Sequence, residues 1–303
     1  MPTAPPMPAA PLAVRLRTST AVRRVIPTGI ALARAERKGE RRWLDPGQRA
    51  RASAAMETIL AGTPRAAEVT ELARLHLIEE EAIAAIFWAP WRTSLLTDAS
   101  ARTVRQVLAG GRPLMISVCH LGPYFQQFSG LTPFGVNAIV VSGDWFFEDP
   151  PPGQWGRRLA RWARGVAEAR VRLIPATGSF EPVRALLEMG EPVGSYFDMP
   201  GSIRTRFLGK PVELASGTAQ LAHQTGSIVM PMRARREGAQ PWTDVLEPLD
   251  AREFASAAEL HVALAAVHER SILAAPEALE DPARPGSWGA GASAAAWLRQ
   301  SGG

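Results

Sequence analysis

Apolar residues recur at helical spacing in the first third of the chain. Over residues 49–91 they fall three and four positions apart and form two runs, which Gly62-Thr63-Pro64 separates. Residues 100–108 repeat the pattern up to Gly110-Gly111, a pair that is typical of a helix end. This part of the chain is therefore predicted to be helical.

Short apolar runs of strand length then alternate with helical patterns. The predicted strands cover residues 114–118, 136–141, 171–174, 192–197 and 227–233, with a β-rich stretch at 204–212, and the predicted helices cover 155–170, 180–189 and 216–225. Strands that alternate with helices favour a sheet with crossover connections. The predicted fold is α/β, with a mixed, largely parallel central sheet flanked by helices and an N-terminal helical segment.

Changes in composition divide the chain into four parts. Residues 1–12, rich in Pro and Ala, are expected to be a disordered tail, and 13–98 form the helical segment. Residues 99–270 form the α/β core. Residues 271–303, where Ala, Pro and Gly increase, are expected to be a loosely packed tail.

The chain of 303 residues carries a formal charge of +5, almost all of its basic residues being arginine. It shows neither a secretory signal nor an apolar run of the roughly 20 residues that cross a bilayer. Cys119 is the single cysteine, which excludes an internal disulfide, and no His, Cys and Asp cluster has metal-ligand spacing. We expect a cytoplasmic protein without a metal.

Arginines crowd the segment from Arg15 to Arg42, with Val, Leu and Ile between them. Such a segment suits an anionic surface, either the inner membrane face or an acidic carrier protein. Nucleic acid is not expected as a partner, because no recognition motif or basic-aromatic array accompanies the charge. Pro27 interrupts any single long helix there.

The strand at 114–118 runs directly into His120. A histidine just beyond a buried strand lies at the sheet edge where α/β enzymes collect their chemistry. Cys119 is interpreted as a packing residue, since adjacent side chains of a strand point to opposite faces. His76, His223, His261 and His268 are interpreted as structural.

The order of several blocks resembles the lysophospholipid acyltransferase superfamily, in particular its bacterial lipid A late-acyltransferase branch. The likeness covers roughly residues 50–240. The blocks that carry it are His120-Leu121-Gly122, Ile174-Pro175, Gly190-Glu191-Pro192, Phe207-Leu208-Gly209-Lys210-Pro211, Gly217-Thr218-Ala219, Thr225-Gly226 and Val229-Met230-Pro231.

The resemblance implies transfer of an acyl group from a thioester of acyl carrier protein or coenzyme A to a hydroxyl or amine, without a cofactor. His120 would be the general base. A carboxylate five residues on would orient it, but Phe125 stands there. Three interpretations stay open: Asp144 or Asp198, which both follow strands, supplies the acid; an amine or thiol acceptor needs less help; or the site binds an acyl chain without turning it over.

The remaining candidates are substrate-binding residues. Arg204 and Arg206 suit a phosphate of the donor or of a phospholipid acceptor. Gly217 and Thr218 open a helix whose free amides suit an anion, unless Ser216 caps them. Tyr124, Phe125, Gln126 and Trp145 are expected to line an apolar slot for an acyl chain.

The predicted function is thus an acyltransferase acting on a small-molecule, lipid or carrier-bound acceptor, such as an intermediate of secondary metabolism. Two alternatives stay open: a catalytically silent acyl- or carrier-protein-binding module, and a thioester hydrolase in which His120 activates water.

Overall fold

The computed structural model describes Val22, Ala89, Phe147 and residues 25–87, 92–124, 126–144 and 171–283. Within these residues eight strands form one sheet in the order β1-β9-β8-β2-β5-β3-β4, and β10 pairs with β8. The strands are β1 (Leu95–Leu96), β2 (Leu114–Val118), β3 (Ile139–Ser142), β4 (Arg172–Pro175), β5 (Val193–Tyr196), β8 (Ile228–Glu237), β9 (Gln240–Val245) and β10 (Leu249–Asp250). The predicted helix at 155–170 lies outside the described residues.

The centre of the sheet is parallel. β2 pairs in parallel with β5 and β8, and β3 pairs in parallel with β4 and β5. β9 and β10 pair antiparallel with β8. The predicted fold class, a mixed and largely parallel sheet flanked by helices, is confirmed.

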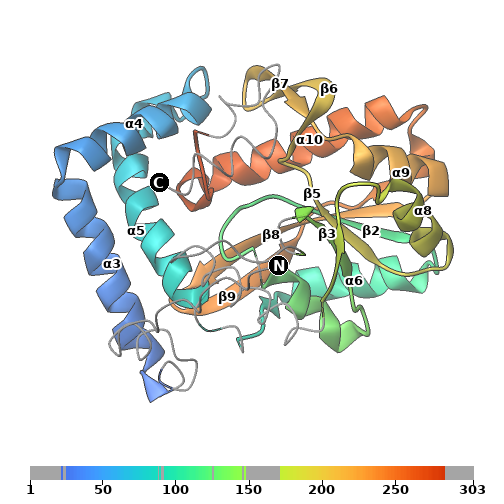
Figure 1. Ribbon diagram of the computed structural model, residues 1–303, viewed down its shortest axis with the longest axis horizontal. Coiled ribbons are helices and arrows are strands. Elements are labelled where there is room, and N and C mark those ends of the chain that lie inside the picture. The colour runs from blue at the N-terminus through green and yellow to red at the C-terminus, as the bar shows by residue number, and fades with distance from the viewer. Residues whose placement is uncertain are drawn as a thin grey trace, which may run out of the picture.

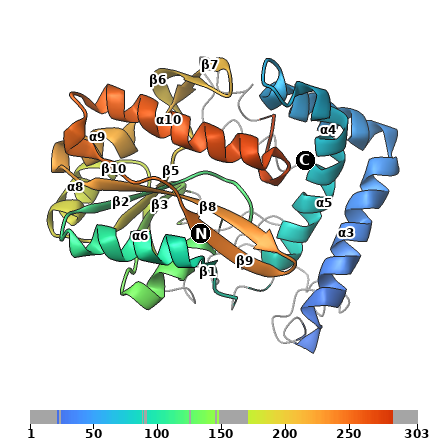
Figure 2. The ribbon, with the colours of Figure 1, turned by 180° about the vertical axis from the view of Figure 1, so that it is seen from behind.

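Helices cover both faces of the sheet (Figures 1 and 2). They are α6 (Asp98–Ala109), α8 (Phe180–Glu188), α9 (Gly217–Thr225) and α10 (Ala257–Ala274). The helices α4 (Pro46–Leu60) and α5 (Val69–Phe87) pack on each other at one end of the molecule (Figure 1). On one face α8, α9 and α10 pack with Met115 and Val193; we call this the α10-side core. On the other, α6 and the 3-10 helix η2 (Gln127–Phe134) pack with Ile116 and Met230; we call this the α6-side core.

Helix α3 (Thr28–Leu44) begins directly after Pro27 and lies against α5, at the periphery of the molecule (Figure 1). The two helices approach so closely that a Cβ on Gly39 would lie 2.4 Å from the Cα of Ile78. Arg42 bridges to Glu80 and Glu81 at 2.8 and 3.0 Å. Part of the basic N-terminal segment therefore pairs with acidic residues of α5 within the same protein.

A separate hairpin of β6 (Pro200–Phe207) and β7 (Lys210–Leu214) follows β5 and lies beside α10 (Figure 1). Its alternation is regular: Thr205 and Phe207 are buried, whereas Arg204 and Arg206 are exposed. Gly209, at a φ of 72°, lies in the turn between the strands.

The sequence led us to expect a loosely packed tail from residue 271 on, but residues 271–283 are packed against the rest of the protein. Ser271, Ile272, Ala278 and Leu279 are buried. Main-chain hydrogen bonds hold this segment on the loop after β2: Gly122 N–H donates to the carbonyl of Ala278 at 2.8 Å. Residues 271–283 thus pack as part of the α/β core, since backbone pairing needs no apolar pattern in the sequence.

Candidate active site

His120 follows the central strand of the sheet. All five residues of β2 are buried between β5 and β8, so the strand is fixed on both edges. Val118 of β2 lies opposite Tyr196 of β5 in parallel register. Because neighbouring parallel strands end at the same edge, the residues two positions beyond, His120 and Asp198, lie side by side.

Both carboxylate oxygens of Asp198 bind His120. Nδ1 of the imidazole lies 2.8 Å from Oδ1, and the backbone N–H of His120 donates to Oδ2 at 3.0 Å. The side chain of Asp198 is 1% exposed and that of His120 is 14% exposed. A buried, ionised carboxylate can only accept, so it places the ring proton on Nδ1 and leaves the lone pair on Nε2.

The outer nitrogen of this imidazole is available for chemistry. Within the described residues no hydrogen bond to Nε2 of His120 is found. A neutral imidazole with its lone pair on Nε2 and a carboxylate behind Nδ1 is the arrangement that a general base needs. The site can therefore accept a proton from an O–H or N–H that approaches Nε2.

Two tyrosines surround the imidazole. The ring of Tyr196 is stacked on that of His120, and the ring of Tyr124 meets it edge-on. The hydroxyl of Tyr124 donates to Oε1 of Glu280 at 2.6 Å. Burial raises the pKa of Tyr196 well above its ordinary value of 10.0, and the charges of Asp198 and Glu280 raise it further, so Tyr196 is a neutral phenol at physiological pH.

Gly122 shapes the loop that carries His120. Its φ of 64° is in the left-handed region, and a Cβ there would lie 2.3 Å from the carbonyl oxygen of Ala234 on β8. The other side of the loop is held by Glu280, whose N–H donates to the carbonyl of His120 at 2.9 Å. Glycine is thus required both by the backbone angle and by the close approach of β8.

Asp144, the other carboxylate that the sequence offered, binds elsewhere. It follows β3, which β5 separates from β2. The N–H of Thr177 donates to its carboxylate at 3.0 Å, and so does the Thr177 hydroxyl. These hydrogen bonds lower the pKa of Asp144. Of the two candidates, Asp198 is therefore the one that binds His120, whereas Asp144 binds Thr177 in the turn after β4.

The other predicted contact residues are distributed over several places. Gln126 is buried, and its amide donates to the carbonyls of Ile86 and Ala89 at 3.5 and 3.3 Å, at the end of α5. Phe125 and Trp145 lie outside the described residues. Arg204 and Arg206 are exposed on the β6–β7 hairpin and form no ion pair with a described residue.

Gly217 and Thr218 open α9, and the side chain of Thr218 contacts the sheet. The hydroxyl of Thr218 lies 2.6 Å from that of Ser195 on β5, and both residues are buried. The side chain of Ser216 does not cap the helix. The Thr218–Ser195 contact fixes the first turn of α9 on β5, the strand that leads to Asp198.

Four histidines make contacts within the fold. The ring nitrogens of these side chains pair with the Glu277 carbonyl (His76), the Phe254 carbonyl (His223), the Thr205 hydroxyl (His261) and the Ser117 hydroxyl (His268). Burial lowers the pKa of His268 to about 4, against the attraction of Asp198. Cys119 is buried in the α10-side core.

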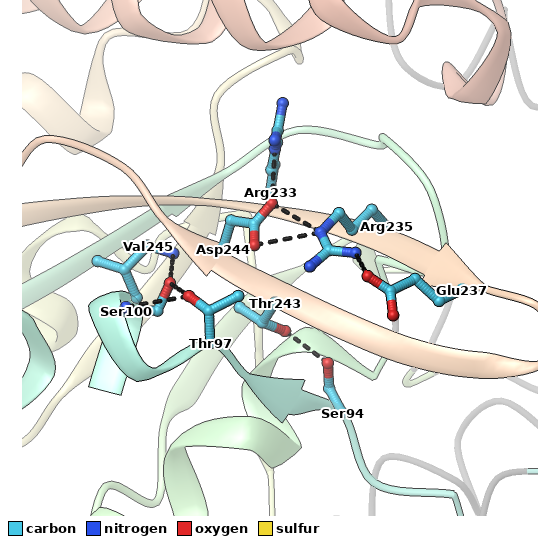
Figure 3. Close-up of polar contacts among 9 residues, drawn as sticks. All are labelled: Ser94, Thr97, Ser100, Arg233, Arg235, Glu237, Thr243, Asp244 and Val245. Carbon is cyan, nitrogen blue, oxygen red and sulfur yellow. Dashed lines mark hydrogen bonds and ion pairs between the residues drawn. The ribbon is translucent and has the colours of Figure 1, made fainter. Parts of the chain in front are cut away.

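Arg233 and Arg235 of β8, beyond the end of β2, pair with acids of the same hairpin (Figure 3). Nε of Arg233 and Nε of Arg235 both donate to Asp244 Oδ2 at 3.0 Å. Arg235 also pairs with Glu237, and Arg236 on the same strand with Glu79 of α5. This pairing favours a structural role for these arginines, within the hairpin for Arg233 and Arg235 and between β8 and α5 for Arg236.

Sequence reasoning missed two residues that contact His120 or its neighbours, Tyr196 and Glu280. Tyr196 is the last residue of β5 and lies two positions before Asp198, so strand alternation continued past the strand end would place both on one face. That signal could have found it. Glu280 had no such signal, because it comes from the segment that was expected to be loose.

Among the described residues, no group of three or more His, Cys, Asp and Glu side chains is arranged to hold a metal ion. In the same part of the chain, no helix combines the length and the apolar character that crossing a bilayer requires.

The fold and the site together give an α/β sheet with a histidine–aspartate pair beyond the carboxyl ends of two adjacent parallel strands. No family model matches the chain, and no curated protein matches it. Among solved structures, it is similar to the 1-acyl-sn-glycerophosphate (LPA) acyltransferase PlsC from Thermotoga maritima: the sequences are 14% identical, the TM-score is 0.38, and the match covers 69% of this chain and 81% of that one. A superposition of this quality assigns neither a reaction nor a substrate.

Proposed function

We propose that the protein is an acyltransferase that moves an acyl group from an acyl thioester to a hydroxyl or amine, with His120 as the general base. The observation that carries the proposal is the bond between His120 Nδ1 and the buried carboxylate of Asp198. The order of sequence blocks around this pair, which resembles the lysophospholipid acyltransferases, supports the choice of reaction.

The proposed reaction needs no group beyond these side chains. His120 Nε2 takes the proton of the acceptor as its oxygen or nitrogen attacks the thioester carbonyl. Asp198 stabilises the imidazolium that forms. When the tetrahedral intermediate collapses, the carbon–sulfur bond breaks and the imidazolium returns the proton to the leaving thiolate. The products are the acylated acceptor and a free thiol.

The classes of donor and acceptor are inferred from the resemblance to the lysophospholipid acyltransferases and from two exposed arginines near the site. Arg204 and Arg206 lie on the hairpin that directly follows Asp198, exposed and without an ion pair to a described residue. Guanidinium groups of this kind suit the phosphates of coenzyme A, of the acyl-carrier-protein arm or of a phospholipid acceptor. We propose these classes as substrates.

The proposal is tested by measuring thiol release from palmitoyl- and octanoyl-coenzyme A, with and without a lysophospholipid, a polyol or an alkyl amine. We expect release that depends on an acceptor, together with an acylated acceptor detected by mass spectrometry. Release without any acceptor would indicate a hydrolase. No release from these donors or from acyl carrier protein thioesters would leave only a binding module.

We also propose that α3 contacts an anionic membrane surface. Ile30, Arg34, Arg37, Arg41 and Leu44 follow one another at spacings of three and four residues, so they share a face. All five are exposed, and the arginines form no ion pair with a described residue. Basic side chains between exposed apolar ones are typical of a helix that lies on anionic lipid.

Replacing Arg34, Arg37 and Arg41 by Gln is expected to weaken binding to phosphatidylglycerol-containing vesicles by about 100-fold, because each arginine near such a surface contributes about 1 kcal/mol. Cosedimentation with these vesicles measures the affinity of each variant. The matched control replaces the exposed Arg102, Arg105 and Arg270 by Gln, which removes the same charge elsewhere. Equal loss in both variants would show that total charge is responsible and would refute a role for α3.

A further inference from the structure

Within the described part of the chain, the imidazole of His120 meets two aromatic rings in different ways. The ring of Tyr196 is nearly parallel to it, at a centroid distance of 4.2 Å and an interplanar angle of 20°. The ring of Tyr124 is nearly perpendicular, at 4.8 Å and 75°. Only Tyr196 therefore presents its π face to the face of the imidazole.

The position of Tyr196 is fixed by the sheet. Its backbone lies opposite Val118 in the parallel ladder of β2 and β5. Its side chain packs against the α6-side core. A ring that is held from beneath in this way is a rigid support for the imidazole stacked on it.

The π face of a phenol carries negative charge density and attracts a cation placed over it. As the proposed general base, His120 becomes an imidazolium when it takes the acceptor proton. A ring stacked on it therefore binds the charged form more tightly than the neutral one. Because Tyr196 remains protonated, this effect comes from the ring itself and not from a phenolate charge.

We infer that Tyr196 is a positioning residue of the general base: its ring keeps the imidazole of His120 parallel to it and stabilises the positive charge that His120 gains. This role rests on the proposed function. Among the described residues, the titratable groups that contact His120 or its neighbours include Tyr196 of β5, Asp198 just beyond it, Tyr124 in the loop and Glu280 from the C-terminal segment. His268 of α10 interacts with the charge of Asp198. Glu280 contacts the His120 main chain and the Tyr124 hydroxyl, and Asp198 binds Nδ1, whereas Tyr196 stacks on the face of the ring.

The test compares Tyr196→Leu, which removes the ring, with Tyr196→Phe, which removes only the hydroxyl. Diethyl pyrocarbonate reacts with neutral imidazole, and mass spectrometry of the peptide that contains His120 follows the reaction at each pH. Loss of the ring is expected to move the midpoint of the reaction about one pH unit lower, because the imidazolium is no longer stabilised. Tyr196→Phe is expected to keep the wild-type midpoint. Tyr124→Phe serves as the matched control for loss of a hydroxyl beside His120.

Three results would overturn the inference: an unchanged midpoint in Tyr196→Leu, an equal shift in Tyr196→Phe, or a His120 that stays unmodified at every pH. If Tyr196→Leu does not fold, Tyr196→Met replaces the ring with a flexible chain and is measured instead.

This readout does not depend on turnover. A shifted midpoint without thioester turnover in the wild type would overturn the proposed function and keep the contact between Tyr196 and the imidazolium. Thioester turnover with an unshifted midpoint in Tyr196→Leu would keep the proposed function and overturn the role of Tyr196. In an active wild type, Tyr196→Leu is expected to lower kcat about 10-fold with KM retained, and Tyr196→Phe to restore kcat.

Discussion

Asp198→Asn is expected to lower kcat for thioester transfer by about 10⁴-fold. An asparagine amide can accept through its oxygen but not through its nitrogen, whereas the native carboxylate accepts from both Nδ1 and the backbone N–H of His120. If the amide oxygen stays on the backbone N–H, the amide nitrogen faces Nδ1 and donates to it. The ring proton then moves to Nε2, and the base has no lone pair for the acceptor.

The same measurement on His120→Ala and on the double variant tests whether the two residues act as a unit. We expect His120→Ala to abolish transfer, and the double variant to be no worse than His120→Ala alone, since neither side chain works without the other. Asp144→Asn is the matched control, because Asp144 binds Thr177 and is expected to leave kcat unchanged. Unchanged transfer by His120→Ala would exclude His120 as the base.

Gly122→Ala is expected to lower the free energy of unfolding by about 2–5 kcal/mol and to abolish transfer. An alanine costs about 1–2 kcal/mol at a φ of 64°, and its Cβ would lie 2.3 Å from a backbone oxygen that is fixed in β8. The loop can relieve this contact only by moving away from β8, and His120 would move with it. Urea unfolding and thiol release measure the two effects.

Gly135→Ala separates the cost of the backbone angle from the cost of the contact. Gly135 has a φ of 79°, and a Cβ there would meet nothing within 4 Å. We expect this variant to lose only about 1–2 kcal/mol and to keep its transfer activity. Equal losses in the two variants would mean that the approach of β8 to Gly122 is unimportant.

Much of the fold could be predicted from local patterns. The strand at 114–118 has the predicted bounds, because an apolar run between Pro113 and His120 has few other interpretations. The helix α10 was not predicted. Its buried face includes His261, His268 and Ser271, and these polar residues interrupt the apolar stripe on which such a prediction depends.

The sequence limits the acidic partner of His120 to two candidates, Asp144 and Asp198, but it does not decide between them. Asp144 and Asp198 both follow strands, and nothing local distinguishes them. The choice depends on the order of strands in the sheet, where β5 lies next to β2 and β3 lies beyond it. That order is set by how the crossover helices pack, which involves contacts between distant parts of the chain.

The bond between Asp198 and both the ring and the main chain of His120 has a consequence for how such sites are recognised. The acid comes from a different strand, 78 residues further along the chain, and reaches the base through the register of the sheet. A pattern search that demands an acidic residue five positions after the histidine would discard this chain, although its imidazole holds a carboxylate. Comparing the ends of neighbouring strands in three dimensions would retain it.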